Sequence, residues 1–113
     1  MILEKKEDAL QSDCYIWFHN SYPDLRGLLC YNLNNSANKI QGNKNKAMGV
    51  QSGRSDMVFY YKSNSYMIEF KDEKGFLSKS QKDWGTLIQN NGFSYFVIRD
   101  FQDFKNLIVQ IIT

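Results

Sequence analysis

The sequence has few cysteines and no long apolar run. Its 113 residues include two cysteines, Cys14 and Cys30, in segments that we predict to be helix and strand. No apolar run approaches the roughly 18 residues that a membrane-spanning helix needs. The opening stretch MILEKKEDALQ is too charged for a secretory signal. We therefore expect free thiols, a reducing compartment and a cytoplasmic location.

The chain also lacks a strong net charge, an internal repeat and a linker. The formal net charge is only +2, which neither demands nor excludes a nucleic-acid partner, so any basic footprint must be local. Hydrophobic residues make up 42% and aromatic residues 15% of the sequence. That content suits a single domain over residues 1–113 with one modest core.

The spacing of metal-binding side chains does not suit zinc. The single histidine, His19, and the two cysteines supply too few ligands, and no CxxC-type pair is present. A structural zinc protein is therefore the least favoured interpretation.

Hydrophobic periodicity predicts elements in the order α-β-β-β-α-β-α. Pro23 marks the end of the first helix, and Ser63–Asn64 is the expected tight turn between the second and third strands. The Asn-, Gly- and Lys-rich stretch 34–54 is expected to be mostly loop, with a short helix near 43–48. This order predicts a mixed α/β fold, a small sheet flanked by helices. The expected helices span 3–20, 79–91 and 101–112, and the expected strands span 25–33, 55–62, 65–71 and 93–99.

The third predicted strand carries charges where its pattern calls for buried residues. Side chains alternate between the faces of a strand, so Glu69 and Lys71 share one face, about 7 Å apart. The exposed face of an edge strand would also explain them. Asp56, however, opens the preceding strand, although aspartate is disfavoured inside strands. A hairpin would bring Asp56 beside Glu69 and Lys71.

Two further polar residues lie on predicted apolar helix faces. Gln81 shares a face with Trp84 and Ile88, with Leu87 beside it, and Glu7 shares one with the apolar residues of the first helix. A charge is rarely buried without a partner. The alternative for Gln81 is a position at the boundary of the core. The alternative for Glu7 is a frayed, exposed first turn of the helix.

Two neighbouring carboxylates repel each other unless a cation lies between them. Mg²⁺ prefers oxygen ligands, and it commonly keeps waters and binds substrate phosphate. An adjacent lysine would stabilise developing negative charge or orient a water. The grouping of Asp56, Glu69 and Lys71 is therefore suited to hydrolysis of a phosphodiester.

Several motifs occur in a recognisable order: EDALQSDCYIW at 7–17, GRSD at 53–56, IEFK at 68–71 and LSKSQ at 77–81. Together they resemble the signature of the PD-(D/E)xK nuclease superfamily, and more narrowly its VRR-Nuc (virus-type replication-repair nuclease) domain. The segments LRGLLCYNLNN (25–35) and KAMGVQSG (46–53) are also similar, so the resemblance covers nearly the whole chain. The family usually has a proline before the aspartate, where this sequence has Ser55.

The resemblance implies a restriction-endonuclease-like core and a role for each matching residue. Asp56 and Glu69 would be metal ligands, aided by the backbone carbonyl of Phe70. Lys71 would be the catalytic lysine.

The resemblance also gives roles to residues outside the hairpin. Gln81 would support the nucleophilic water or contact the scissile phosphate. Glu7 would complete the acidic cluster, through Lys71 or through a second metal, and Glu4 is the alternative to Glu7. Gly53 would allow a close backbone approach just before the aspartate.

The activity and partners follow from the same resemblance. Stand-alone members of this size resemble phage-encoded nucleases and are similar in fold to Holliday-junction resolvases. The implied function is a Mg²⁺- or Mn²⁺-dependent DNA endonuclease, structure-selective or nicking, in replication, repair or recombination. It would act as a homodimer on branched, nicked or duplex DNA, because such DNA offers paired strands. No membrane and no organic cofactor are expected. The alternative is a non-catalytic nucleic-acid-binding module with the same fold, which is disfavoured because Asp56, Glu69 and Lys71 are all present.

Basic residues on both sides of the predicted site would contact DNA phosphates. Ordinary solvated surface is the alternative for each of them. They are Lys39, Lys44, Lys46 and Arg54 in the 34–54 stretch, and Lys74, Lys79 and Lys82 on the other side.

Overall fold

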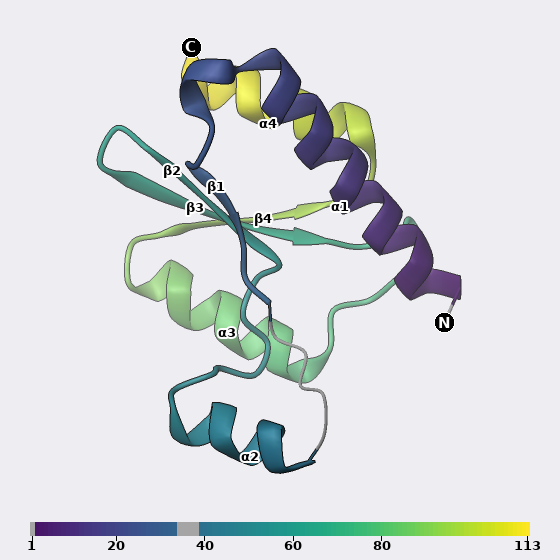
Figure 1. Ribbon diagram of the computed structural model, residues 1–113, viewed down its shortest axis with the longest axis vertical. Coiled ribbons are helices and arrows are strands. Elements are labelled where there is room, and N and C mark those ends of the chain that lie inside the picture. Colours follow the sequence, from purple (N-terminus) through teal and green to yellow (C-terminus); the bar gives the residue numbers. More distant parts are fainter. Residues whose placement is uncertain (1, 34–38) are drawn as a thin grey trace.

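The structure, a computed structural model, describes residues 2–33 and 39–113, and the side chains from Lys6 onward. One four-stranded sheet has the order β1-β2-β3-β4, antiparallel except for the parallel pair β3 and β4. The predicted small mixed sheet flanked by helices is confirmed (Figure 1). The helices are α1 (Ile2–Ser21), α2 (Lys39–Ala47), α3 (Lys79–Asn90) and α4 (Phe101–Ile112), with a 3-10 helix η1 (Pro23–Leu25). The strands are β1 (Leu29–Tyr31), β2 (Met57–Tyr61), β3 (Asn64–Phe70) and β4 (Ser94–Ile98).

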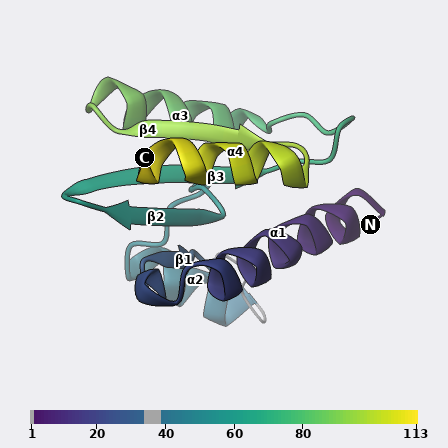
Figure 2. The ribbon, with the colours of Figure 1, turned by 90° about the horizontal axis from the view of Figure 1, so that it is seen from above.

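The sheet lies between two layers of helices. Helices α1 and α4 lie side by side on one face, and α3 lies on the other (Figures 1 and 2). Alternation along β2 and β3 points Met57, Phe59 and Ile68 toward α1 and α4, where all three are buried. Phe18 of α1 packs on Phe59, with ring centroids 5.4 Å apart. The same alternation points Glu69 to the opposite face, under α3.

Two predicted segments have different bounds in the structure. The run 25–33 is not one strand, because the chain first turns through η1, with Pro23 at its first position, and only Leu29–Tyr31 pairs with β2. In the 34–54 stretch, the helix begins at Lys39, before the predicted 43–48. An i,i+4 hydrogen bond of 2.7 Å from Gln41 to Asn45 supports its first turns. Residues 34–38 of the predicted loop lie outside the described residues.

The hairpin turn between β2 and β3 is Lys62–Ser63, not the predicted Ser63–Asn64. Lys62 and Ser63 have φ angles of +46° and +70°, and Tyr61 pairs with Asn64 on either side of them. A two-residue turn with positive φ matches the right-handed twist of the two strands, although glycine is the more usual residue at such positions.

The turn decides which residues lie opposite each other at the far end of the hairpin. Met57 pairs with Ile68, so Asp56, one residue earlier, lies across from Glu69. The predicted turn would have placed Asp56 across from Lys71. The observed register brings the two carboxylates together directly.

The two cysteines are free thiols, as predicted. Cys14 lies on α1 and is buried in the core, and this burial raises its thiol pKa to about 12. Cys30 lies on β1 and donates to the carbonyl of Gly27. Among the described residues, no helix is long and apolar enough to cross a membrane.

Candidate active site

Two carboxylates meet at the end of the β2–β3 hairpin. Glu69 lies in β3, between β2 and β4, with only 2% of its surface exposed. The alternative of an exposed edge strand is therefore wrong. The Asp56 Oδ2 atom accepts a 2.7 Å hydrogen bond from the backbone N–H of Phe70. The side chains of Asp56 and Glu69 are within hydrogen-bonding reach of each other.

Burial raises the pKa values of both carboxyl groups. Burial is the largest cause that raises the pKa of Asp56. Burial first, and then the charge of Asp56, raises the pKa of Glu69 to about 8, although the nearby Lys71 opposes this. With both groups ionised, Glu69 Oε1 is buried and has no hydrogen-bond partner among the described residues. A shared proton or a bound cation would satisfy that oxygen.

Lys71 and Glu7 join this cluster from two different elements. Lys71 directly follows β3, and its Nζ lies 3.9 Å from Oε1 of Glu7 on α1, with side-chain exposures of 12% and 20%. The Glu7 Oε2 atom accepts a hydrogen bond of 3.3 Å from the backbone N–H of Asp72. Glu7 is therefore not part of a frayed, exposed turn, and it reaches the cluster through Lys71. The side chain of Glu4, the alternative, lies outside the described residues.

Gln81 connects the cluster to the first turn of α3. Its Nε2 donates a 3.0 Å hydrogen bond to Oε2 of Glu69, and its Oε1 accepts a 2.8 Å bond from the backbone N–H of Ser78. The Ser78 hydroxyl in turn accepts from the Gln81 N–H, which completes a capping box. Both ends of the amide are engaged, so its orientation is fixed. The predicted N-cap at Ser78 and the inward face of Gln81 are confirmed.

The turn before Asp56 packs against the start of α3. Gly53 has a φ of +80°, and a Cβ at this position would lie 2.1 Å from the carbonyl oxygen of Ser80. The predicted close approach is therefore present, and it is an approach to α3. Ser55, in the place of the family's proline, is fully buried. Its hydroxyl donates to the Met57 carbonyl at 3.0 Å, and its carbonyl accepts from Asn32 Nδ2 at 3.1 Å. These bonds hold the turn without a proline.

Tyr95 on β4 is a neighbour of the cluster that sequence reasoning missed. Its hydroxyl is buried without a hydrogen-bond partner among the described residues. Burial first, and then the charges of Glu69 and Asp56, raise its pKa. Gly85 of α3 leaves room for the ring, because a Cβ there would lie 3.2 Å from it. Leu87, which was expected beside the apolar stripe of α3, is 58% exposed. The sequence feature that could have indicated it is a tyrosine hydroxyl in an otherwise apolar strand.

Arg99 is a second residue without a sequence-based prediction. Its Nη1 donates to the carbonyl oxygens of Asp72 and Gly75 at 2.9 and 2.7 Å. Arg99 thus holds the loop that follows Lys71 in place, and this fixes the path of the chain as it leaves the cluster.

The predicted DNA-contacting residues are all exposed, and they divide into two groups. Three of them lie on α2, which has no buried residue, and no aspartate or glutamate occurs between residues 25 and 55. This segment therefore carries only positive charge. On the other side, Lys79 forms a 2.8 Å ion pair with Asp83, so its charge is partly compensated. The exposed residues are Lys39, Lys44, Lys46, Arg54, Lys74, Lys79 and Lys82.

The oxygen-rich cluster fits a hard divalent cation with few protein ligands. Among the described residues, no three His, Cys, Asp or Glu side chains converge closely enough to hold a metal unaided. Asp56 and Glu69 would share the ion with a backbone oxygen, waters and substrate phosphate, as Mg²⁺ commonly does. The N–H of Phe70 points to Asp56, and the carbonyl of a strand residue points to the same side as its N–H. The Phe70 carbonyl is therefore directed to the same site.

Comparisons with known proteins identify the family and support the fold. The family model of the VRR-NUC domain matches residues 5–101. A solved structure described as a VRR_NUC domain protein is similar in fold, with a TM-score of 0.78 and 20% sequence identity, over 94% of this chain and 87% of that one. No curated protein matches the sequence. Because the family model covers most of the chain, the protein belongs to the VRR-NUC domain family, a nuclease-type family.

Proposed function

We propose that this protein is a Mg²⁺- or Mn²⁺-dependent DNA endonuclease. The supporting observation is the buried pair of Asp56 and Glu69, in which one carboxylate oxygen has no partner among the described residues. A site that raises the pKa of Glu69 to about 8 holds a proton in the absence of metal, and a divalent cation replaces that proton favourably. Apolar residues at these two positions would stabilise a core better than buried charged groups do, so a structural role alone does not explain the pair.

Each neighbouring side chain has a task in phosphodiester hydrolysis. When bound, the cation would polarise the phosphate and make water a stronger nucleophile at neutral pH. Lys71 pairs with Glu7, its charge lowers the pKa of Asp56 and Glu69, and it would stabilise the negative charge that develops on the phosphate. Gln81 fixes one oxygen of Glu69 and leaves the other for the site. Arg99 donates a hydrogen bond to the carbonyl of Asp72 and would thereby help to hold the neighbouring Lys71 in the cluster.

The DNA would lie across the end of the sheet where the carboxylates meet. Phosphates on one side would contact the basic α2 segment. This segment contains no aspartate or glutamate. A homodimer would allow one copy to engage each strand of a branched, nicked or duplex substrate. We place this activity in replication, repair or recombination in the cytoplasm.

Cleavage assays test the proposal. Branched, nicked, duplex and single-stranded DNA are incubated with the protein in Mg²⁺, in Mn²⁺ or in EDTA, and the products are separated on denaturing gels. We expect cutting of at least one substrate with metal and none with EDTA. Asp56→Asn is the matched inactive control, because it keeps the size of the side chain and removes one charge.

The same assay tests the alternative of a binding module. If no substrate is cut with either metal while DNA is bound tightly, the nuclease proposal is wrong and the fold serves binding alone. Cutting in EDTA would also contradict it, because the acid pair would then have no metal-dependent role.

A further inference from the structure

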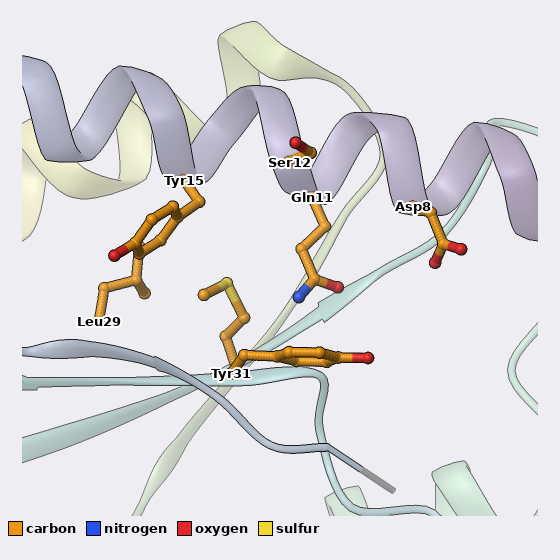
Figure 3. A pocket seen from close by; sticks show the side chains of 7 residues that line it. Asp8, Gln11, Ser12, Tyr15, Leu29 and Tyr31 are labelled. Atoms are coloured by element: carbon orange, nitrogen blue, oxygen red, sulfur yellow. The ribbon is translucent and has the colours of Figure 1, made fainter. Parts of the chain in front are cut away.

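A pocket lies between α1 and the edge strand β1. It has a volume of about 450 Å³, within the range of roughly 300–1,000 Å³ typical of small-molecule sites. Figure 3 shows the Tyr31 ring below α1, with the Gln11 amide pointing down toward it and Asp8 one turn nearer the N-terminus of the helix. Tyr15 and Leu29 lie at the opposite end (Figure 3).

The lining of this pocket suits a flat, neutral group with polar edges. Tyr31 offers a ring that is 55% exposed although it belongs to a strand. Gln11 supplies both a donor and an acceptor, and Asp8 supplies acceptors. None of the seven lining residues is basic, so the pocket does not fit a phosphate. A nucleobase has the matching properties, since it stacks on aromatic rings and offers amino and carbonyl groups at its edge.

The pocket adjoins the candidate active site along two elements, although the Met57 side chain of the pocket faces α1 and the Glu69 side chain faces α3. On α1, Asp8 of the pocket follows Glu7 of the cluster. On the sheet, Met57 of the pocket follows Asp56, and Met57 pairs with Tyr31 of β1. Immediately after Tyr31, the backbone N–H of Asn32 donates a 2.8 Å hydrogen bond to the Asp56 carbonyl. The pocket and the acids thus lie one residue apart along α1 and along the chain that enters β2.

We propose that this pocket receives one unstacked base of the DNA strand next to the phosphate that is cut. The inference rests on the proposed function, and it narrows the substrate to DNA with an unpaired or easily unpaired nucleotide at that position, such as a flap, a branch or a single strand. Continuous duplex cannot place a base here unless the base leaves its stack, which costs energy. Tyr31 provides the stacking surface, and Gln11 and Asp8 contact the edge of the base.

The test measures binding without cleavage. Fluorescent duplexes with and without a single-nucleotide flap are titrated with wild-type protein and variants in Ca²⁺, and separately in EDTA. We expect the wild type to prefer the flap, and Tyr31→Leu to lose about tenfold in affinity for the flap with no change for duplex. Tyr31→Phe, which keeps the ring, should retain the preference. Tyr60→Leu is the matched control, because Tyr60 is a strand tyrosine with 45% exposure outside the pocket.

A second readout follows the base itself. 2-Aminopurine placed in the flap should lose fluorescence on binding wild-type protein and Tyr31→Phe, because stacking quenches it, and should keep its fluorescence with Tyr31→Leu. Equal losses of affinity for Tyr31→Leu and Tyr60→Leu, or no flap preference in the wild type, would overturn the inference. So would Tyr31→Leu converting a dimer to a monomer in sedimentation, which would make the pocket a contact between copies. Because no cleavage is needed, a failed nuclease assay and a failed base pocket give different results.

Discussion

Asp56, which directly precedes β2, lies across from Glu69 of β3, and one buried oxygen of Glu69 has no hydrogen-bond partner among the described residues. The neighbouring Phe70 N–H and Gln81 amide each satisfy another oxygen of this pair. The pair is thus held firmly in place while its charge remains incompletely compensated. Charge state, stability and metal binding should be linked through these two residues.

The stability of the metal-free protein should fall as the pH rises from about 4.5 to about 8. Burial and the charge of Asp56 raise the pKa of Glu69 from its ordinary value of 4.5 to about 8 in the folded protein, so in this window the folded chain holds a proton that the unfolded chain releases. The unfolding free energy therefore decreases with pH. Thermal unfolding in EDTA at several pH values measures the slope. Glu69→Gln should flatten it, and Glu73→Gln, at an exposed position, should not. An equal slope in all three proteins would contradict the assignment.

Divalent metal should stabilise the wild type and not Asp56→Asn. The cation relieves the repulsion between the two carboxylates, whereas the amide removes both that repulsion and a ligand charge. Calorimetric titration with Mg²⁺ and Mn²⁺, and thermal unfolding in excess metal, measure the effect. Asp24→Asn, at an exposed site on η1, is the control. Unchanged metal affinity in Asp56→Asn would show that the ligand assignment is wrong.

Lys71→Ala should abolish cleavage and leave metal and DNA binding largely intact. The lysine is proposed to act on the charge that develops during the reaction, so its loss affects the rate more than the affinity. Single-turnover cleavage and DNA titration in Ca²⁺ separate the two quantities. Lys62→Ala, at an exposed position in the hairpin turn at the other end of β3, serves as the control. Full activity of Lys71→Ala would exclude the proposed role.

Gln81→Ala should reduce cleavage much more than Ser78→Ala does. Both variants break the capping box, which costs about 1 kcal/mol of stability, but only Gln81→Ala removes the hydrogen bond to Glu69. Urea unfolding should give similar losses for the two, whereas cleavage rates should differ. If the two variants lose activity equally, Gln81 acts only as a helix cap.

Tyr95→Phe should stabilise the metal-free protein or leave its stability unchanged. The hydroxyl is buried without a partner among the described residues, and an unsatisfied buried polar group costs about 1–3 kcal/mol. Urea unfolding in EDTA measures the change, and Tyr66→Phe, on the opposite face of the sheet, is the comparison. A clear loss of stability in Tyr95→Phe would mean that a water satisfies the hydroxyl in the folded protein.

Much of this protein could be predicted from local sequence patterns. The apolar stripe of α4 predicted the bounds 101–112, which agree with the observed helix, because one face of that helix is continuously apolar. The Ser78 and Gln81 spacing predicted the start of α3, since a capping box is a local structure. The motif order predicted the family and identified Asp56, Glu69, Lys71, Gln81 and Glu7, which the structure brings together.

The tertiary structure decided the features that depend on long-range contacts. The strand pattern alone did not determine the position of the turn, which differs by one residue from the prediction. The observed turn at Lys62–Ser63 sets Asp56 opposite Glu69 rather than Lys71. Tyr95 belongs to the site because β4 lies parallel to β3 and Gly85 leaves room for its ring. The sequence by itself determined which chemical groups are present and which local elements carry them. Their pKa values and partners followed from burial and strand pairing, which depend on residues far apart in the chain.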